Sequence, residues 1–283
     1  MLEDQLNGAS QPSLERAPGG SPSAAAPGEP SVFSACARLF WVTIRRQMFS
    51  RQTLVGLALA GLCCLIVLAW SRHHAPTAKR FAEQILVPTY LVFLLPVLAV
   101  CYGASGIGGE REEGTLIYLL IVPIPRPLIY LVKFAATVGL VVAGSLGTLA
   151  ALCLLAGASG RETFPMFFMS SLLGSAAYAS LFLMLGAAFR HGTVIALAYW
   201  FFLEVLLGNM PGIVKRVSIA FYMRCLVYDA GAELELAPLG RAAREMYLPI
   251  SGAAAQTTLV CAIAGLLTVG LWAFSRREYR DLS

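Results

Sequence analysis

Long apolar stretches with few or no charged side chains are the feature that most constrains this fold. Several of them exceed about 18 residues, and a helix needs roughly 20 apolar residues to cross a bilayer. The whole chain is 58% apolar and 13% charged, whereas soluble domains are about 45–50% apolar and 25% charged. The alternating segments of about ten residues that mark a membrane β-barrel do not occur. The sequence therefore predicts an all-α fold, a polytopic membrane helical bundle.

Six transmembrane helices are predicted from the positions of the apolar runs. They cover residues 53–71, 85–107, 128–156, 166–188, 193–212 and 251–274. Lys133, near the start of the third, is expected to extend its ammonium group back to the lipid head groups. Residues 157–165 are predicted to be a short connection and 213–250 a long outer one. The long connection could form a helix at the membrane surface or a cap folded on the bundle, and both interpretations stay open.

The N-terminal region differs in composition from the apolar runs. Residues 1–30 are rich in Pro, Gly, Ser and Ala and are predicted to be a disordered tail. Residues 31–51 carry aromatic and apolar side chains at three- and four-residue steps, with arginines beside them. This pattern predicts an amphipathic interfacial helix, an elbow that precedes the six-span membrane domain at 52–275. The apolar stripe of the elbow could contact lipid or its own protein.

Lysine and arginine in short loops predict the orientation, because they accumulate on the cytoplasmic side of a membrane. One side carries the larger set, which comprises Arg38, Arg45, Arg46, Arg51, Arg111, Arg126, Lys133, Arg190, Arg276, Arg277 and Arg280. The opposite side carries Arg72, Lys79, Arg80 and Arg161 in short loops. Both termini, including a short tail at 276–283, are therefore predicted to be cytoplasmic in a multi-pass protein of the cell inner membrane.

A dense cluster of charge interrupts the apolar runs between the second and third predicted spans. Glu110, Arg111, Glu112 and Glu113 are consecutive, and Gly114 and Thr115 follow. Each charge at the centre of a membrane costs roughly 2.5–3.5 kcal/mol on insertion scales. The segment 108–127 is therefore expected to leave the membrane and lie in water.

The polar segments show no pattern of residues for catalysis or for a cofactor. The glycines of 103–109 are spaced like those of a phosphate-binding loop, but Gly109 and Glu110 stand where such a loop needs Lys and then Ser or Thr. His73 and His74 are adjacent, so they cannot share one helix face as metal ligands, and no metal site is predicted. The net charge of +5 fits cytoplasmic arginines better than nucleic-acid binding. The chain is predicted not to be an enzyme.

Glu204 is the ionisable residue that stands out within a predicted span. An ionisable side chain at this depth is a functional candidate by default. It could face a polar pathway, or it could bond to a neighbouring helix in a structural role. Asn209 and the pair Pro211-Gly212 follow closely, so the fifth span is also expected to end in a re-entrant bend.

These features together resemble an ABC transporter permease of the exporter-like type-two family. The resemblance covers roughly residues 31–280 and is similar to short six-span permeases of copper-site maturation and gliding-motility systems. Its most specific part comprises Glu110, Arg111, Glu112, Glu113, Gly114, Thr115 and Leu116, followed by Pro123 and Arg126. In this family such a segment is a coupling helix that docks on an ABC ATPase subunit. The resemblance therefore implies an ATP-driven exporter with a permease dimer surrounded by membrane lipids, and with ATP and Mg in the partner subunit.

Two other functions stay open from the sequence. Glu204 could take up the proton of an ion-coupled secondary carrier, although the two halves of the chain show no convincing inverted repeat. The chain could also be a membrane scaffold of an assembly system, with no pathway of its own.

Overall fold

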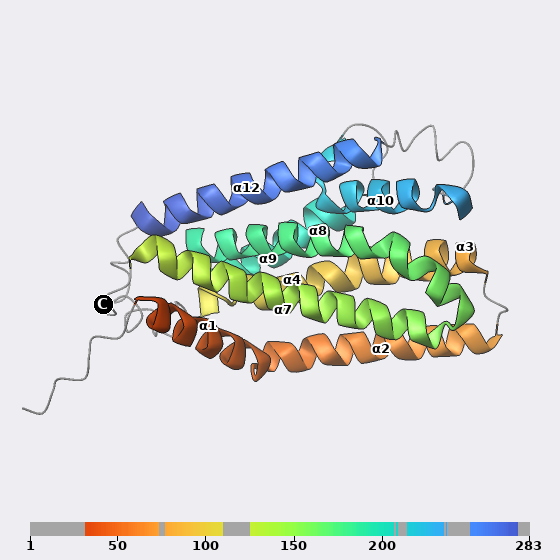
Figure 1. The fold of residues 1–283 in the computed structure, drawn as a ribbon, viewed down its shortest axis with the longest axis horizontal. Helices are drawn as coiled ribbons and strands as arrows, with labels where there is room; N and C mark the ends of the chain where they lie inside the picture. Colours follow the sequence, from red (N-terminus) through yellow and green to blue (C-terminus); the bar gives the residue numbers. More distant parts are fainter. Residues whose placement is uncertain are drawn as a thin grey trace, which may run out of the picture.

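The fold is a bundle of helices that lie roughly along one long direction (Figure 1). The computed structural model describes residues 32–73, 77–109, 125–206, 208, 214–234, 236 and 250–276. Within these residues every regular element is helical: α1 Val32–Met48, α2 Arg51–His73, α3 Ala78–Phe81, η1 Ala82–Leu94, α4 Leu95–Gly103, α7 Arg126–Leu155, α8 Ala158–Ala188, α9 Gly192–Tyr199, η2 Trp200–Leu206, η4 Val214–Val217, α10 Ile219–Ala230, η5 Ala232–Leu234 and α12 Gly252–Arg276. The prediction of an all-α polytopic bundle is confirmed. The predicted tail at 1–30 lies outside the described residues.

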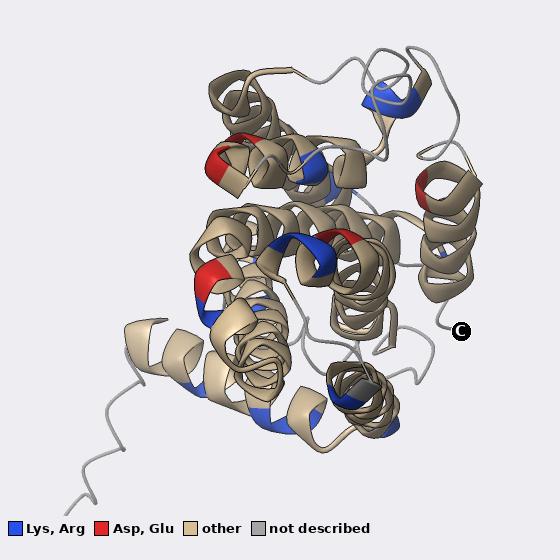
Figure 2. Ribbon diagram, turned by 90° about the vertical axis from the view of Figure 1, so that its right-hand side faces the viewer, with Lys and Arg blue, Asp and Glu red and all other residues tan. Residues whose placement is uncertain are grey.

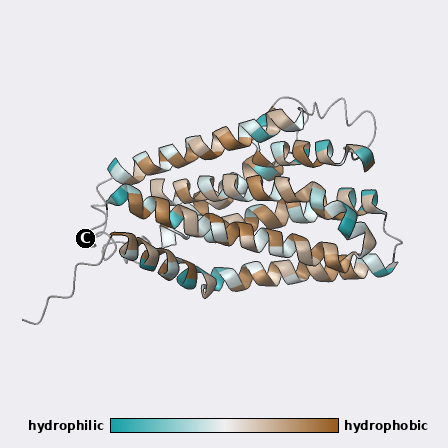
Figure 3. Ribbon diagram, in the orientation of Figure 1, coloured by the Kyte–Doolittle hydropathy of each residue, from teal (hydrophilic) through white to brown (hydrophobic). Residues whose placement is uncertain are grey.

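Five of the described helices are long and apolar enough to cross a membrane. They are Arg51–Arg72, Ala78–Gly103, Arg126–Leu155, Ala158–Ala188 and Gly252–Arg276. The fifth predicted span corresponds to a shorter apolar helix, Gly192–Leu206. Apolar residues dominate the long helices (Figure 3). That the chain crosses the membrane six times stays a prediction, because this shorter helix is below the length that a complete crossing needs.

The second long helix, Ala78–Gly103, contains a π-helical stretch. Element η1 holds Pro88 in its interior, and α4 follows with Pro96 in its first turn. Proline has no backbone N–H to donate, and local π-helical geometry is one way in which a membrane helix adjusts to that loss. The helix therefore continues through both prolines.

The connection predicted at 157–165 is wrong, because α8 already begins at Ala158. Ala156 and Gly157 make the turn, and Gly157 has a φ of 69°, which lies in the region that glycine adopts at little cost. Gly160 then lies so close to α7 that a Cβ there would overlap the carbonyl oxygen of Cys153. Small residues at such positions let membrane helices approach closely. The polar residues of this stretch suggested a loop. In the structure, Gly157 and Gly160 instead allow α7 and α8 to form a tight helical hairpin.

Gly160→Ala is expected to destabilise the α7–α8 hairpin, because the added methyl group meets backbone that cannot rotate away. Overpacking of this kind costs about 1–3 kcal/mol. A lower melting temperature of the purified protein would record the effect. Gly147→Ala in α7 is the matched control, because a Cβ there meets nothing within 4 Å. Equal melting temperatures for the two variants would contradict the close approach.

Helix α8 lies at the centre of the bundle and positions most of its neighbours. It packs against α4, α7, α9, α10 and α12. Its buried side includes several serines as well as Phe167, Tyr178 and Phe182. By contrast α2 and α12 expose much of their apolar surface, for example Leu57 at 64% and Val269 at 51%. In a membrane protein these exposed apolar faces are where lipid contacts the bundle.

Candidate functional site

The predicted docking segment begins and ends at one end of the bundle. Residues up to Gly109 and from Pro125 onward are described, and α1 and the end of α12 lie at this same end (Figure 1). Most of the predicted docking residues lie outside the described residues: Glu110, Arg111, Glu112, Glu113, Gly114, Thr115, Leu116 and Pro123. Arg126 is described, and it is exposed as the first residue of α7. Its predicted role in docking stays a prediction.

A cluster of polar contacts holds the chain where it leaves the second long helix. The Lys133 ammonium group of α7 donates to the Gly106 carbonyl over 2.8 Å. The Gln47 amide of α1 donates to the Tyr102 carbonyl at 3.4 Å and to the Thr137 hydroxyl of α7 at 3.5 Å. We call these five residues the exit cluster. It joins three separate elements just before residue 110.

Lys133 does not extend to the lipid head groups as predicted. Its side chain is fully buried inside the bundle, and its ammonium group bonds to backbone oxygen. The turn after α4 interrupts the regular helix and presents the Gly106 carbonyl to α7, where the ammonium group bonds to it. A lysine within an apolar run is a signal that can be read in the sequence, because such a charge needs a polar partner in the bundle. Gln47 gave no comparable signal, because polar residues are common on an amphipathic helix.

Helix α1 buries two uncharged polar residues and exposes aromatic ones. Its buried residues are Thr43 and Gln47, whereas Phe33 and Trp41 are 84% and 67% exposed. Its charged residues are all basic, and charged residues are sparse along the bundle as a whole (Figure 2). An exposed aromatic face beside arginines is typical of a helix that lies in the membrane interface. Of the two alternatives for the apolar stripe, this arrangement favours lipid contact.

Glu204 lies within η2, in the fifth predicted span, and is fully buried. Its carboxylate accepts hydrogen bonds from the backbone N–H groups of Ile219 and Ala220 at 3.0 and 3.1 Å. The Ser218 hydroxyl donates to the same carboxylate at 2.5 Å, and the Tyr199 hydroxyl donates at 3.4 Å. Glu204 therefore caps the N-terminal end of α10, where unpaired N–H groups and the helix dipole favour negative charge.

Helix α10 is part of the bundle and not a helix on its surface. It packs against α8, α12 and η1, and it buries Phe221, Met223 and Cys225. In Figure 1, α10 lies toward the opposite end of the bundle from α1. Of the two interpretations of 213–250, a segment folded on the bundle is therefore the one observed for the described residues. The geometry gives Glu204 the structural role among its alternatives, and a direct role in a pathway stays a prediction.

The match to known families decides the class of this bundle. Residues 41–214 match the family described as ABC-2 family transporter protein. The chain belongs to this family. The match begins inside α1 and ends in η4, so it includes the exit cluster, the docking segment and Glu204. None of the curated proteins compared with the chain matched it. The ABC-2 chain is thus a membrane-spanning transport permease and is not itself catalytic.

Proposed function

We propose that this ABC-2 permease is the membrane subunit of an ATP-driven exporter, with ATP and Mg bound by a separate ABC ATPase subunit. The observation that carries the proposal is the family match over residues 41–214. The residues proposed to dock the ATPase are Glu110, Arg111, Glu112, Glu113, Gly114, Thr115 and Leu116, with Pro123 and Arg126 behind them. ABC-2 membership supports an ATPase partner in general, and the charged segment is the part of this chain that suits such a partner.

The exit cluster supports this assignment because it links the start of the docking segment to the bundle. Lys133 and Gln47 fix the backbone at Gly106 and Tyr102, only a few residues before Glu110. Arg126, near the end of the segment, is also the first residue of α7. A movement of the segment would therefore reach α4 and α7 together, as rigid elements shift in hinge or shear motions.

The assembly follows from the same proposal. Two permeases and two ATPases form the working unit in the inner membrane, and no nucleic acid takes part. Both termini and the docking segment face the cytoplasm, where ATP is available. The apolar residues exposed on α1 face the lipid of that leaflet.

Reversing the charge of the docking segment tests the proposal. In Glu112→Lys/Glu113→Lys, recovery of the ATPase with the affinity-tagged permease should fall about tenfold or more, because unlike charges at an interface become like charges. Quantitative mass spectrometry of the captured complex, prepared from cells that express both subunits, measures the recovery. The control is Glu162→Lys on the exposed surface of α8. Undiminished recovery in the double variant, with the control also unchanged, would count against docking at this segment.

A further inference from the structure

The helix at Gly192–Leu206, formed by α9 and η2, buries little of itself in the bundle. Its buried residues are Gly192, Ala196 and Glu204, so the one long side chain that it buries is that of an ionisable residue. Its larger apolar side chains are partly buried or exposed, for example that of Phe202, which is 57% exposed. By contrast α8, against which it packs, buries several complete aromatic side chains. Apolar packing therefore holds the 192–206 helix less firmly than it holds α8.

In a membrane, polar contacts decide how firmly such a helix is held. Lipid chains are as apolar as leucine, so an apolar face that leaves a neighbouring helix for lipid loses little beyond close packing. A hydrogen bond between helices is harder to replace, because lipid chains offer neither a donor nor an acceptor. The polar contacts of the 192–206 helix therefore contribute most to its position.

Polar contacts of η2 join this helix to η1 and α10. The Trp200 indole N–H donates to the Val92 carbonyl of η1 at 3.4 Å. The Glu204 carboxylate accepts three hydrogen bonds from the N-terminal end of α10, one from a hydroxyl and two from backbone N–H groups. Helix α10 is itself fixed, because it packs against α8, α12 and η1. We call the Glu204 carboxylate with these three bonds the latch.

The other end of the 192–206 helix has the features of a hinge. A short turn at 189–191 joins α8 to α9, and Phe189 is extended there, with a φ of −122° and a ψ of 149°. After the turn, Gly192 lies against Gly186 of α8, and a Cβ on Gly192 would come within 2.5 Å of the Gly186 Cα. Two glycines meet here through their backbones, so no side chains interlock at this contact. Because hinges are commonly a few residues at the ends of elements, the helix can tilt about this turn.

We propose that the 192–206 helix tilts as a unit about the turn at 189–191, and that the latch holds its η2 end against α10. In the closed state, which the structure shows, the latch bonds are made. In the open state η2 separates from α10 and η1, and water enters between them, because an ionised carboxylate and unpaired N–H groups are costly in lipid. Helix α10 lies toward the end of the bundle opposite to α1 (Figure 1), so the opening is remote from the docking segment. The proposal concerns the permease alone and does not depend on the ATPase.

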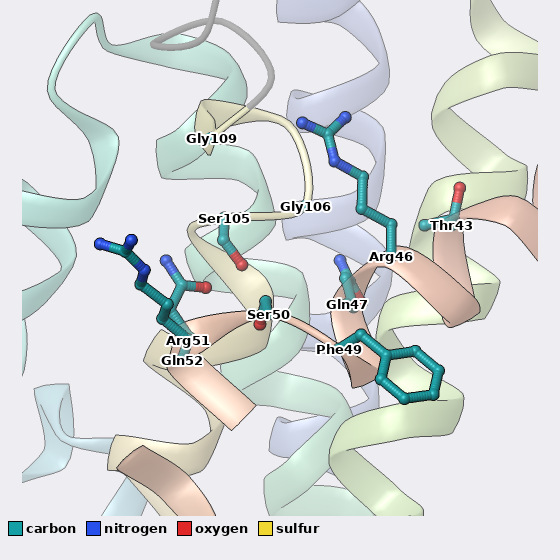
Figure 4. Close-up of a pocket in the computed structure, with 10 residues that line it drawn as sticks. All are labelled: Thr43, Arg46, Gln47, Phe49, Ser50, Arg51, Gln52, Ser105, Gly106 and Gly109. Atoms are coloured by element: carbon teal, nitrogen blue, oxygen red, sulfur yellow. The ribbon is translucent and has the colours of Figure 1, made fainter. Parts of the chain in front are cut away.

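The opposite end of the bundle supplies a reference that the tilt should not change. There α1, the start of α2 and the turn after α4 line a cavity of about 510 Å³, with Gln47 near the turn that holds Ser105 and Gly106 (Figure 4). The described residues that line this cavity all lie outside the 192–206 helix. The exit cluster bonds the turn to α1 and α7. Hydrogen exchange at 104–109 is therefore expected to be the same whether the latch is closed or open.

Hydrogen exchange at the start of α10 measures the opening. The N–H groups of Ile219 and Ala220 have no partner within α10 and are bonded to Glu204, so they exchange when the latch opens. Mass spectrometry of the purified full chain, with electron-transfer fragmentation, resolves these amides. Trp200→Phe is the test variant, because it removes the N–H that bonds to η1 and leaves the latch unchanged. Since the helix tilts as a unit, exchange at 219 and 220 should rise about threefold in this variant.

A second variant and a control accompany this test. Gly192→Ala adds a methyl group that displaces the helix at the hinge, so it should also raise exchange at 219 and 220, although it lies at the far end of the helix. Phe202→Leu is the matched control, because Phe202 is an exposed aromatic residue of η2, and its exchange should equal that of the unsubstituted chain. A thermal melt shows that each variant is folded, and if one of the two test variants does not fold, the other decides the outcome.

Three results would overturn the proposal. Unchanged exchange at 219 and 220 in the folded test variants would show that the first turn of α10 frays by itself and that the 192–206 helix does not move as a unit. A rise of the same size at 225–228 would show that α10 leaves the bundle. An equal rise in Phe202→Leu would show a general loosening of η2 that does not depend on its polar contacts.

Discussion

Glu204→Ala is expected to loosen α10 from the bundle. The substitution leaves the N–H groups of Ile219 and Ala220 and the Ser218 hydroxyl without their buried acceptor. Hydrogen bonds to a charged group contribute about 1.5–3 kcal/mol, and a buried donor left unpaired costs a comparable amount, so a loss on the order of 3 kcal/mol is expected. A thermal melt of the purified protein should shift down by about 6–12 °C.

The local effect can be measured at Cys225, which lies in α10 and is 1% exposed. In a variant that keeps Cys225 as its sole cysteine, maleimide labelling should be slow. Glu204→Ala should speed it about 100-fold, because 1.4 kcal/mol of local stability corresponds to a factor of ten in the open population. Glu204→Gln retains one acceptor oxygen. Its labelling rate should therefore lie between the rate with Glu204 and the rate in Glu204→Ala.

The exposed Glu162 of α8 supplies the control, since Glu162→Ala removes a carboxylate without touching α10. Ser218→Ala distinguishes the contribution of the Ser218 hydroxyl to the cap of α10 from that of the Glu204 carboxylate. Ser218 also accepts from the Phe221 N–H, so its loss should cost about 1 kcal/mol, as at other helix N-caps. Labelling of Cys225 that is equally slow in all of these variants would show that Glu204 does not hold α10.

The sequence predicts the long helices well, because each consists of an apolar run of sufficient length. The first, third and sixth predicted spans agree with α2, α7 and α12 to within a few residues. The fifth could not be predicted in the same way. The described part of its helix ends at Leu206, and three of the groups that bond to Glu204 come from Ser218, Ile219 and Ala220, in a later segment whose mixed composition gave no preference between surface and interior.

The candidate sites were predictable only in part, for a physical reason. Charge in an apolar run is visible in a sequence, and it drew attention to Glu204. The partners of a buried charge are visible only in the fold: the Gly106 carbonyl is 27 residues from Lys133, and the Gln47 amide is 90 residues from Thr137. Rules based on distance from a helix end therefore placed Lys133 at the head groups, whereas the folded chain supplies a carbonyl.

Lys133→Met is expected to free the backbone between α4 and residue 110. Methionine has a similar length and can fill the same apolar space, but it cannot donate to the Gly106 carbonyl. A buried carbonyl without a partner costs about 1–3 kcal/mol. At about 2 kcal/mol, the amides of 104–109 should exchange hydrogen about 30-fold faster in the variant. Hydrogen exchange followed by mass spectrometry would resolve this segment from the rest of the bundle.

The location of the change matters more than its size. Exchange should rise at 104–109 and in the last turn of α1, because Gln47 bonds to the neighbouring Tyr102 carbonyl, whereas the middle of α8 should be unaffected. Lys79→Met in α3 is the matched control, since it removes a lysine from a different element. If Lys133→Met leaves exchange at 104–109 unchanged, then the turn is held by its own backbone bonds, such as Gly108 N–H to the Ala104 carbonyl at 3.1 Å. If it accelerates exchange there, one buried ammonium group fixes the point at which the chain leaves the bundle.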